Sequence, residues 1–246
     1  MDDVLPSVSV RRLLIVDDEP HVRKFLRLAL EAEGFTVFEA ASADGAIVSV
    51  RCDIPDLIVL DLGLPDLDGT QVIRDVRLSS DVPILVLSGR TEDSEKIAAL
   101  DHGADSYVAK PFVMRDLVFQ VRSVLLRRDL WLNRGKDGYI VTGPLRIHLQ
   151  NSEVYRDEKP VELEPAEYDL IRMLAANGGR ILTVRRLERE LWGREGDQSL
   201  HVDLQRHIHN LRRKLETEPS FPRYIVTEPS IGYRLELVPP VQRHPQ

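Results

Sequence analysis

Short apolar runs alternate with amphipathic stretches through the first half of the chain. The runs predict five strands: RLLIVD (12–17), TVFEA (36–40), LIVLD (57–61), PILVLSG (83–89) and SYVAK (106–110). The stretches carry apolar residues at helical spacing and predict helices over 20–35, 43–51, 70–78, 91–104 and 113–128. Continuous apolar strands are typical of sheets that are buried on both faces. We therefore expect an α/β domain whose parallel, doubly wound sheet is covered by helices on both faces.

The pattern changes after residue 128. The polar segment DLWLNRGKDG (129–138) predicts a linker, and residues 139–163 read as several short strands. Helical spacing then predicts helices over 182–193, with Thr183 as its cap, and over 199–216. A final pair of strands is expected within residues 223–237. The second half is thus a separate, smaller domain with a different architecture.

Composition and charge refine this picture. A chain of 246 residues has room for two domains, and no apolar run approaches the ~20 residues of a membrane span. The N-terminus lacks the apolar core of a signal peptide, so we expect a cytoplasmic protein without membrane contact. Residues 1–128 hold 15 Lys and Arg against 22 Asp and Glu, whereas residues 129–246 hold 18 of each. Nucleic-acid contact is therefore expected only in the second half.

Carboxylates gather where the predicted strands end. The first strand ends in Asp17-Asp18-Glu19 and the third in Asp61, while Ser88 and Lys110 end the fourth and fifth. These ends meet at one edge of a parallel sheet, where like charges ~4 Å apart repel by ~4 kcal/mol. One lysine does not balance so many acids, and Mg²⁺ prefers such ligands. A carboxylate beside Mg²⁺ can attack phosphorus, with the charge shared by the metal, Lys110 and Ser88.

The stretch LIVLDLGLPDLDGT (57–70) holds three candidate nucleophiles, Asp61, Asp66 and Asp68. Its end, DLDGT, matches the D-x-D-G-T motif of haloacid-dehalogenase-type phosphatases, so a Mg²⁺-dependent phosphatase is the rival hypothesis. That motif should directly follow a strand, but here it follows Pro65, which favours a turn. We therefore expect Asp61 to be the acceptor, Asp68 to lie in a turn and Thr70 to cap the next helix.

The predicted helix 199–216 has two kinds of face. Leu204, Ile208, Leu211 and Leu215 form an apolar stripe. The other positions offer side chains suited to base edges and phosphates, namely Gln205, Arg206, His209, Asn210, Arg212, Arg213 and Lys214. The alternative is an ordinary solvated helix face. His207 and His209 lack neighbours typical of a metal site, so both are expected at the surface or facing DNA.

In order and spacing, IVDDEP, LIVLDLGLPDLDG, VLSGR and YVAKPF resemble the receiver domain of two-component response regulators. The resemblance covers residues 12–128 and implies a flavodoxin-like five-stranded sheet. It implies that a sensor histidine kinase phosphorylates Asp61. It makes Asp17, Asp18, Asp61 and the Gly63 carbonyl ligands of Mg²⁺. Ser88 becomes the switch hydroxyl, Lys110 the phosphate-pairing lysine and Tyr107 the aromatic switch.

Residues 139–237 resemble the winged helix-turn-helix domain of OmpR/PhoB-type regulators, through VELEPAEYDLIRMLAANGGRILT, LERELWG, HNLRRKLE and IGYRLE. The resemblance implies that helix 200–216 enters the major groove of promoter DNA. The hairpin 225–234 becomes the wing, where Arg234 is a further candidate contact and Glu228 is a poor phosphate neighbour. Glu164 replaces the usual capping threonine. Within the family, the sequence looks most like regulators of Kdp-type potassium transport.

The same resemblance implies a transcriptional regulator rather than an enzyme, with RNA polymerase as a partner and a homodimer formed through residues 91–128. The family usually has Glu and Arg where this chain has Asp116 and Gln120. Asp101 or Asp105 would then lack an ionic partner across the dimer, so we expect a weaker or rewired interface. A DNA-binding protein with a silent receiver is a third alternative, which the intact acidic cluster disfavours.

Overall fold

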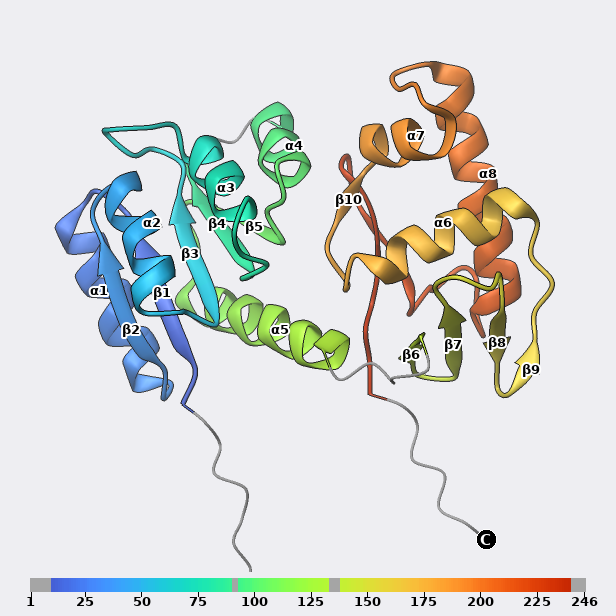
Figure 1. The fold of residues 1–246 in the computed structure, drawn as a ribbon, viewed down its shortest axis with the longest axis horizontal. Coiled ribbons are helices and arrows are strands. Elements are labelled where there is room, and N and C mark those ends of the chain that lie inside the picture. The colour runs from blue at the N-terminus through green and yellow to red at the C-terminus, as the bar shows by residue number, and fades with distance from the viewer. Residues whose placement is uncertain (1–9, 90–92, 133–137, 240–246) are drawn as a thin grey trace, which may run out of the picture. The chain divides into compact units, whose positions relative to one another are not determined.

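The computed structural model describes residues 10–89, 93–132 and 138–239, and the chain divides into two compact units, Met1–Leu125 and Leu126–Gln246. Figure 1 shows the elements of both units along the chain. None of the helices in the described ranges combines the length and the hydropathy that crossing a membrane requires. Each unit has its own hydrophobic core.

The first unit is built on a five-stranded parallel sheet with the order β2-β1-β3-β4-β5. The strands are β1 (Arg12–Val16), β2 (Thr36–Ala40), β3 (Leu57–Asp61), β4 (Ile84–Ser88) and β5 (Ser106–Ala109). The helices are α1 (Pro20–Ala32), α2 (Ala43–Cys52), α3 (Gly69–Arg77), α4 (Asp93–Asp101) and α5 (Met114–Leu132). The predicted doubly wound α/β fold is confirmed, and each strand ends within one residue of its predicted end.

Alternating strand residues bury opposite faces of this sheet. On one face, Leu13, Val59 and Leu85 pack with Leu26 of α1 and Leu117 of α5. The intervening positions are equally buried and form the other face, including Leu14, Ile58, Ile84 and Val86. Since both faces are apolar, side chains that need water or ions can gather only at the strand ends.

In its described residues, the second unit has two antiparallel sheets, the end of α5 and three further helices. The four-stranded sheet has the order β6-β7-β8-β9, from β6 (Tyr139–Thr142), β7 (Leu145–His148), β8 (Val154–Arg156) and β9 (Lys159–Pro160). The helices are α6 (Pro165–Ala176), α7 (Val184–Trp192) and α8 (Gln198–Leu215). The second sheet has the order β10-β12-β11, from β10 (Leu182–Thr183), β11 (Ile225–Glu228) and β12 (Gly232–Leu235). This is the predicted helix-turn-helix with a wing.

The start of α7 differs slightly from its prediction. Leu182 and Thr183 form β10, paired with β12, and the helix begins one residue later. The hydroxyl of Thr183 accepts a hydrogen bond of 3.1 Å from the backbone N–H of Arg186, so Thr183 is the predicted cap. The helix ends at Gly193, whose φ of 72° lies in the left-handed region.

The predicted linker begins too early. Residues 129–132 are the last turn of α5 rather than a linker, and residues 133–137 lie outside the described residues. The helix continues because Leu130 and Trp131 pack against the core of the second unit. Gly178 lies beneath Trp131: a Cβ there would approach the indole ring to 3.0 Å. The polar composition of DLWLNRGKDG favoured a linker, although its Leu130 and Trp131 pack on the core.

Candidate functional site

Lys110 joins two carboxylates at the carboxyl edge of the parallel sheet. Its Nζ lies 2.8 Å from Oδ2 of Asp61, at the end of β3, and 3.0 Å from Oδ2 of Asp17, just after β1. Asp17 and Asp61 are both buried, with 1% and 9% exposure. The three side chains come from three loops that the parallel topology brings to one edge, as the order of the strands predicts.

Asp17 is held on both sides of its carboxylate. Its Oδ1 accepts the backbone N–H of Glu19 at 2.9 Å, while Oδ2 accepts Lys110. Burial raises the pKa of Asp17, and the charge of Asp61 adds to this effect, against the hydrogen bonds from Lys110 and Glu19. The two buried carboxylates of Asp17 and Asp61 thus share the one ammonium of Lys110.

Asp18 completes a carboxylate cluster that opens to solvent. One oxygen each from Asp17, Asp18 and Asp61 lies within 4.8 Å of the other two. Asp18 is exposed, whereas its two partners are buried. Three oxygen ligands with one accessible side fit a hydrated Mg²⁺ ion, which usually keeps several waters.

Gly63 and Gly89 lie in the loops that follow β3 and β4. The N–H of Gly63 donates to Oδ1 of Asp61 at 3.3 Å, which places the loop after β3 against the carboxylate. Among the described residues, a Cβ at Gly89 would meet no atom within 4 Å, so they leave open space just after Ser88. Ser88 itself is buried at the end of β4, and β4 pairs with both β3 and β5.

Tyr107 lies on the edge strand β5, where it pairs with Val86 of β4. The ring is half-buried, and the Lys96 ammonium of α4 lies 5.6 Å from its centroid. Lys110 is three residues further on, and the Lys110–Pro111 peptide bond is cis. Tyr107 therefore lies on the strand that leads to Lys110, and its ring contacts Lys96 of α4.

Asp66 and Asp68, the two acids of DLDGT, both cap helices. Asp66 accepts the N–H groups of Ala43 and Asp44 at 3.0 and 3.2 Å, at the start of α2. These bonds lower the pKa of Asp66. Asp68 caps α3 by accepting the N–H of Thr70 at 2.8 Å, so the prediction that Thr70 is the cap is wrong. Asp68 forms its hydrogen bond one residue before the helix begins.

Asp105 has an ionic partner in its own unit. Its Oδ2 accepts Arg77 at 2.8 Å and the N–H of Ile84 at 2.8 Å. Arg77 of α3 thus pairs with Asp105 within the chain, and the expectation that Asp101 or Asp105 lacks an ionic partner across the dimer stays a prediction. On α5, Asp116 is exposed and Gln120 lies 3.5 Å from the Ser106 hydroxyl.

The exposed face of α8 lies opposite its buried stripe. At 3.6 residues per turn, Val202, Arg206, His209 and Arg213 lie along one line of the helix, and all four are exposed. Gln205 is exposed beside them. Val202 is an apolar side chain that the sequence analysis missed, and such a group can contact a thymine methyl. The signal was its place three residues before Gln205, outside the buried stripe.

The flanks of α8 are bound within the domain. Arg212 donates to the carbonyl of Ile225 and to the hydroxyl of Thr227, both on β11. On the opposite flank, Lys214 lies 2.6 Å from the buried Glu167 of α6. Both cations had been expected to face DNA, and both instead serve packing of neighbouring elements against the helix.

Arg234 of the wing is likewise bound by carboxylates. It pairs with Glu228 across the hairpin at 2.6 Å and with Glu236, which follows the end of β12. Two acids neutralise this cation, so the wing offers DNA little positive charge at that point.

His207 is buried, which contradicts its expected place at the surface. It sits at the edge of the apolar stripe, and the indole of Trp192 lies 6.3 Å from its ring. Glu164 and Glu167 of the α6 N-terminus face it. Spacing along α8 could not show that α6 covers this position.

The comparisons with known proteins agree with both units. Residues 13–122 match the response regulator receiver domain, and residues 158–235 match the C-terminal domain of transcriptional regulatory proteins. The KDP operon transcriptional regulatory protein KdpE of Escherichia coli K12 is 42% identical over 225 residues, 92% of this chain and 99% of that protein. KdpE of Mycobacterium tuberculosis H37Rv is 37% identical over 224 residues, 91% and 98% of the two chains.

Among solved structures, the response regulator DrrB of Thermotoga maritima, an OmpR/PhoB homolog, covers 92% of this chain and 99% of its own, at 25% identity and a TM-score of 0.43. Both family models match in the expected order, and the curated relatives align over nearly their whole length. The chain therefore belongs to the OmpR/PhoB-type two-component response regulators.

Proposed function

We propose that this chain is a transcriptional regulator that is activated when Asp61 accepts a phosphoryl group from a sensor histidine kinase. The observation that carries the proposal is the cluster of Asp17, Asp18, Asp61 and Lys110 at the end of the sheet. Asp66 and Asp68, the rival nucleophiles, are engaged in capping helices. The family to which the chain belongs supports the same role.

The transfer needs one bond to form and one to break. A carboxylate oxygen of Asp61 attacks the phosphorus of a phosphohistidine, and the P–N bond breaks as the imidazole nitrogen takes back the electron pair. Lys110, already within 3.0 Å of both buried carboxylates, is placed to pair with the phosphoryl oxygens. The open space at Gly89 admits the incoming group beside Ser88.

The proposed Mg²⁺ ligands are Asp17, Asp18, Asp61 and the carbonyl of Gly63. The three carboxylates converge within 4.8 Å, and their charge exceeds that of Lys110, so the residues fit a divalent cation. When bound, Mg²⁺ neutralises charge on the phosphoryl oxygens. Asp17 and Asp18 would hold the ion, while Asp61 remains the attacking group.

The proposed switch couples this pocket to the surface. A phosphoryl group on Asp61 would draw the Ser88 hydroxyl towards its oxygens, and Tyr107 would follow into the vacated space. Phosphorylation need only favour one of two existing arrangements to change their populations. The expected output is dimerisation through residues 91–128, which brings two recognition helices to a repeated promoter half-site.

DNA contact is proposed for the exposed face of α8. Gln205, Arg206, His209, Arg213 and the half-buried Asn210 would contact promoter DNA, with Val202 added from the structure. Arg212, Lys214 and Arg234 are withdrawn because partners in the domain bind them. RNA polymerase is the expected partner at the promoter.

Control of potassium-uptake genes is the proposed biological role. The support is the similarity to two proteins named KdpE, one of them called the KDP operon regulator. Selecting DNA fragments of the host genome that bind the phosphorylated chain tests this role. Recovery of potassium-transport promoters supports it, and recovery of unrelated promoters alone contradicts it.

Phosphoryl uptake tests the central proposal. The full chain should gain one acid-labile phosphoryl group from a small acyl phosphate with Mg²⁺, and Asp61→Asn should abolish this gain. Asp66→Asn and Asp68→Asn are matched controls, since they remove acids of the same loop and should leave uptake intact. Steady phosphatase turnover that persists in Asp61→Asn would instead support the rival enzyme.

A further inference from the structure

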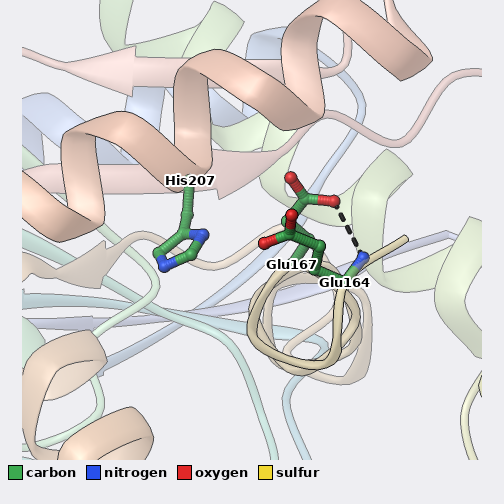
Figure 2. A group of neighbouring side chains, drawn as sticks. All are labelled: Glu164, Glu167 and His207. Carbon is green, nitrogen blue, oxygen red and sulfur yellow. Dashed lines mark hydrogen bonds between the residues drawn. The ribbon is translucent and has the colours of Figure 1, made fainter.

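Three metal-ligating side chains meet between α6 and α8 of the second unit. One donor atom each from Glu164, Glu167 and His207 lies within 4.8 Å of the other two. Figure 2 shows a ring nitrogen of His207 facing the two carboxylates, which come from the first turn of α6. The group lies on the flank of α8 rather than on its exposed face.

The imidazole of His207 has a buried ring nitrogen that could bind a ligand. The side chain is only 8% exposed, and its Nδ1 is buried without a hydrogen-bond partner among the described residues. A buried, unpaired ring nitrogen is unusual, because such groups normally find a partner. The Trp192 ring is tilted by 33° to the imidazole, with its centroid 6.3 Å away. Figure 2 shows that a ring nitrogen of His207 lies on the side of the two glutamates, where a partner could bind.

The two glutamates lie in different surroundings. Glu167 is 1% exposed, and its Oε2 accepts both Lys214 at 2.6 Å and the N–H of Glu164 at 3.0 Å. Burial by itself would raise the pKa of Glu167, but these hydrogen bonds outweigh it and lower the pKa. The Lys214 ammonium thus contacts one of the two carboxylates, and Glu164 lies at the exposed side of the group.

We propose that Glu164, Glu167 and His207 form a binding site for a divalent transition-metal ion, of which Zn²⁺ is the best match. One imidazole nitrogen with two carboxylate oxygens is a donor set that suits Zn²⁺ and leaves a fourth position for water. Imidazole disfavours Mg²⁺ and Ca²⁺, which prefer oxygen ligands alone. Lys214 keeps its place on Oε2 of Glu167.

The geometry requires only a small closure. Tetrahedral Zn²⁺ with bonds of about 2.0–2.2 Å needs donors about 3.3–3.6 Å apart. Glu164 is exposed, and its carboxylate takes part in the capping box with Glu167, so binding the ion would exchange that capping contact for a metal bond without moving the backbone. The bound ion would tie the start of α6 to the middle of α8 and so hold the recognition helix in place. The site does not depend on phosphorylation of Asp61.

Zinc titration of the full chain tests the site. The protein is stripped with a chelator, saturated with Mg²⁺ to fill the receiver pocket, and titrated with Zn²⁺ by calorimetry. We expect one Zn²⁺ per chain, and loss of that binding in Glu164→Gln and His207→Gln. Trp131 and Trp192, the two tryptophans, both lie in the second unit, so their fluorescence follows its unfolding. Zinc at about 100 times its Kd should raise the midpoint temperature of thermal unfolding of the second unit by about 5–10 °C.

Matched variants separate this site from others. His209→Gln removes an exposed histidine two residues away, and the double variant Asp17→Asn, Asp18→Asn removes the receiver ligands; both should keep the zinc. Glu164 is exposed, so Glu164→Gln remains informative if His207→Gln fails to fold. Absence of stoichiometric zinc, or zinc that survives both Glu164→Gln and His207→Gln, overturns the proposal. Loss of zinc in His209→Gln or in the receiver double variant also overturns it.

Discussion

Arg212 on α8 donates two hydrogen bonds, of 3.0 and 2.7 Å, to the main-chain carbonyl of Ile225 on β11. The recognition helix and the first strand of the wing are thus joined by a charged side chain. Glu216, at the end of the same helix, accepts the N–H groups of Arg223, Tyr224 and Ile225. The helix and the wing are therefore positioned together.

Replacing Arg212 should destabilise the second unit. Arg212→Ala removes a charged donor from the Ile225 carbonyl, and such bonds contribute about 1.5–3 kcal/mol. Urea unfolding followed by tryptophan fluorescence should show a loss of this size. Unchanged stability would mean that water replaces the guanidinium at β11.

Replacing its neighbour Arg213 should leave stability unchanged and weaken DNA binding. Arg213 is exposed on the far side of α8, so Arg213→Ala should leave the free energy of unfolding within about 0.5 kcal/mol of the original. Affinity for promoter DNA should fall, and the slope of log K against log salt should decrease by about 1 if the contact is to phosphate. A variant that unfolds more easily but binds DNA normally would refute this assignment.

The Lys214–Glu167 pair predicts a stability change that depends on pH. Lys214→Met leaves the Glu167 carboxylate buried without its ammonium, and we expect a loss of about 2 kcal/mol at neutral pH because Lys214 is partly exposed. The pair lowers the pKa of Glu167, so its stabilisation is present above the ordinary value of 4.5 and is lost as pH falls through the folded pKa. The difference in free energy of unfolding between the original chain and Lys214→Met should therefore become smaller on acidification. Unfolding curves at several pH values can measure it. A difference that stays constant would contradict this account.

Replacing Asp17, a proposed Mg²⁺ ligand, should increase the free energy of unfolding of the first unit. Its pKa is raised chiefly by burial, so its ionised form disfavours the fold once pH rises above the ordinary 3.8. Without divalent cations at neutral pH, Asp17→Asn should stabilise the first unit by on the order of 1 kcal/mol. Asp18→Asn, at an exposed position, should change stability little. Circular dichroism can follow both, and a less stable Asp17→Asn protein would show that the pair with Lys110 outweighs burial.

The dimer interface should be weak. Asp105 is bound by Arg77, and Gln120 lacks the charge expected at its position. We expect sedimentation velocity with a phosphoryl mimic to show a weak dimer that dissociates on dilution, and Gln120→Arg to increase the dimer fraction. A tight dimer of the unaltered chain that appears only with the mimic would sink this idea.

The sequence predicted which side chains meet at the carboxyl edge of the parallel sheet because its signals there are local. Each buried strand reads as an apolar run, and the acid or hydroxyl at its end follows directly. Parallel topology then brings those ends together, so Asp17, Asp61 and Lys110 could be placed without coordinates. The cap of α3 was missed by two residues because both Asp68 and Thr70 are good capping residues, and only backbone geometry distinguishes them.

The contacts in the second unit were harder to predict, because helical spacing identifies the face that packs on the core but not the elements that cover the other sides of the helix. The stripe from Leu204 to Leu215 marks what packs on the core, but not what covers the flanks. Arg212, Lys214 and His207 lie beside that stripe, where β11, α6 and Trp192 meet them. These contacts join distant parts of the chain, and no pattern within α8 records them.

The last turn of α5 decides where this chain can be cut. Leu130 and Trp131 belong to the core of the second unit, and Gly178 leaves space for the indole. An expressed fragment that starts at Tyr139 would lack both side chains and expose the apolar surface they cover. Chimeric regulators that exchange effector domains should therefore place the crossover before Leu126, so that the transferred domain brings this piece of its interior with it.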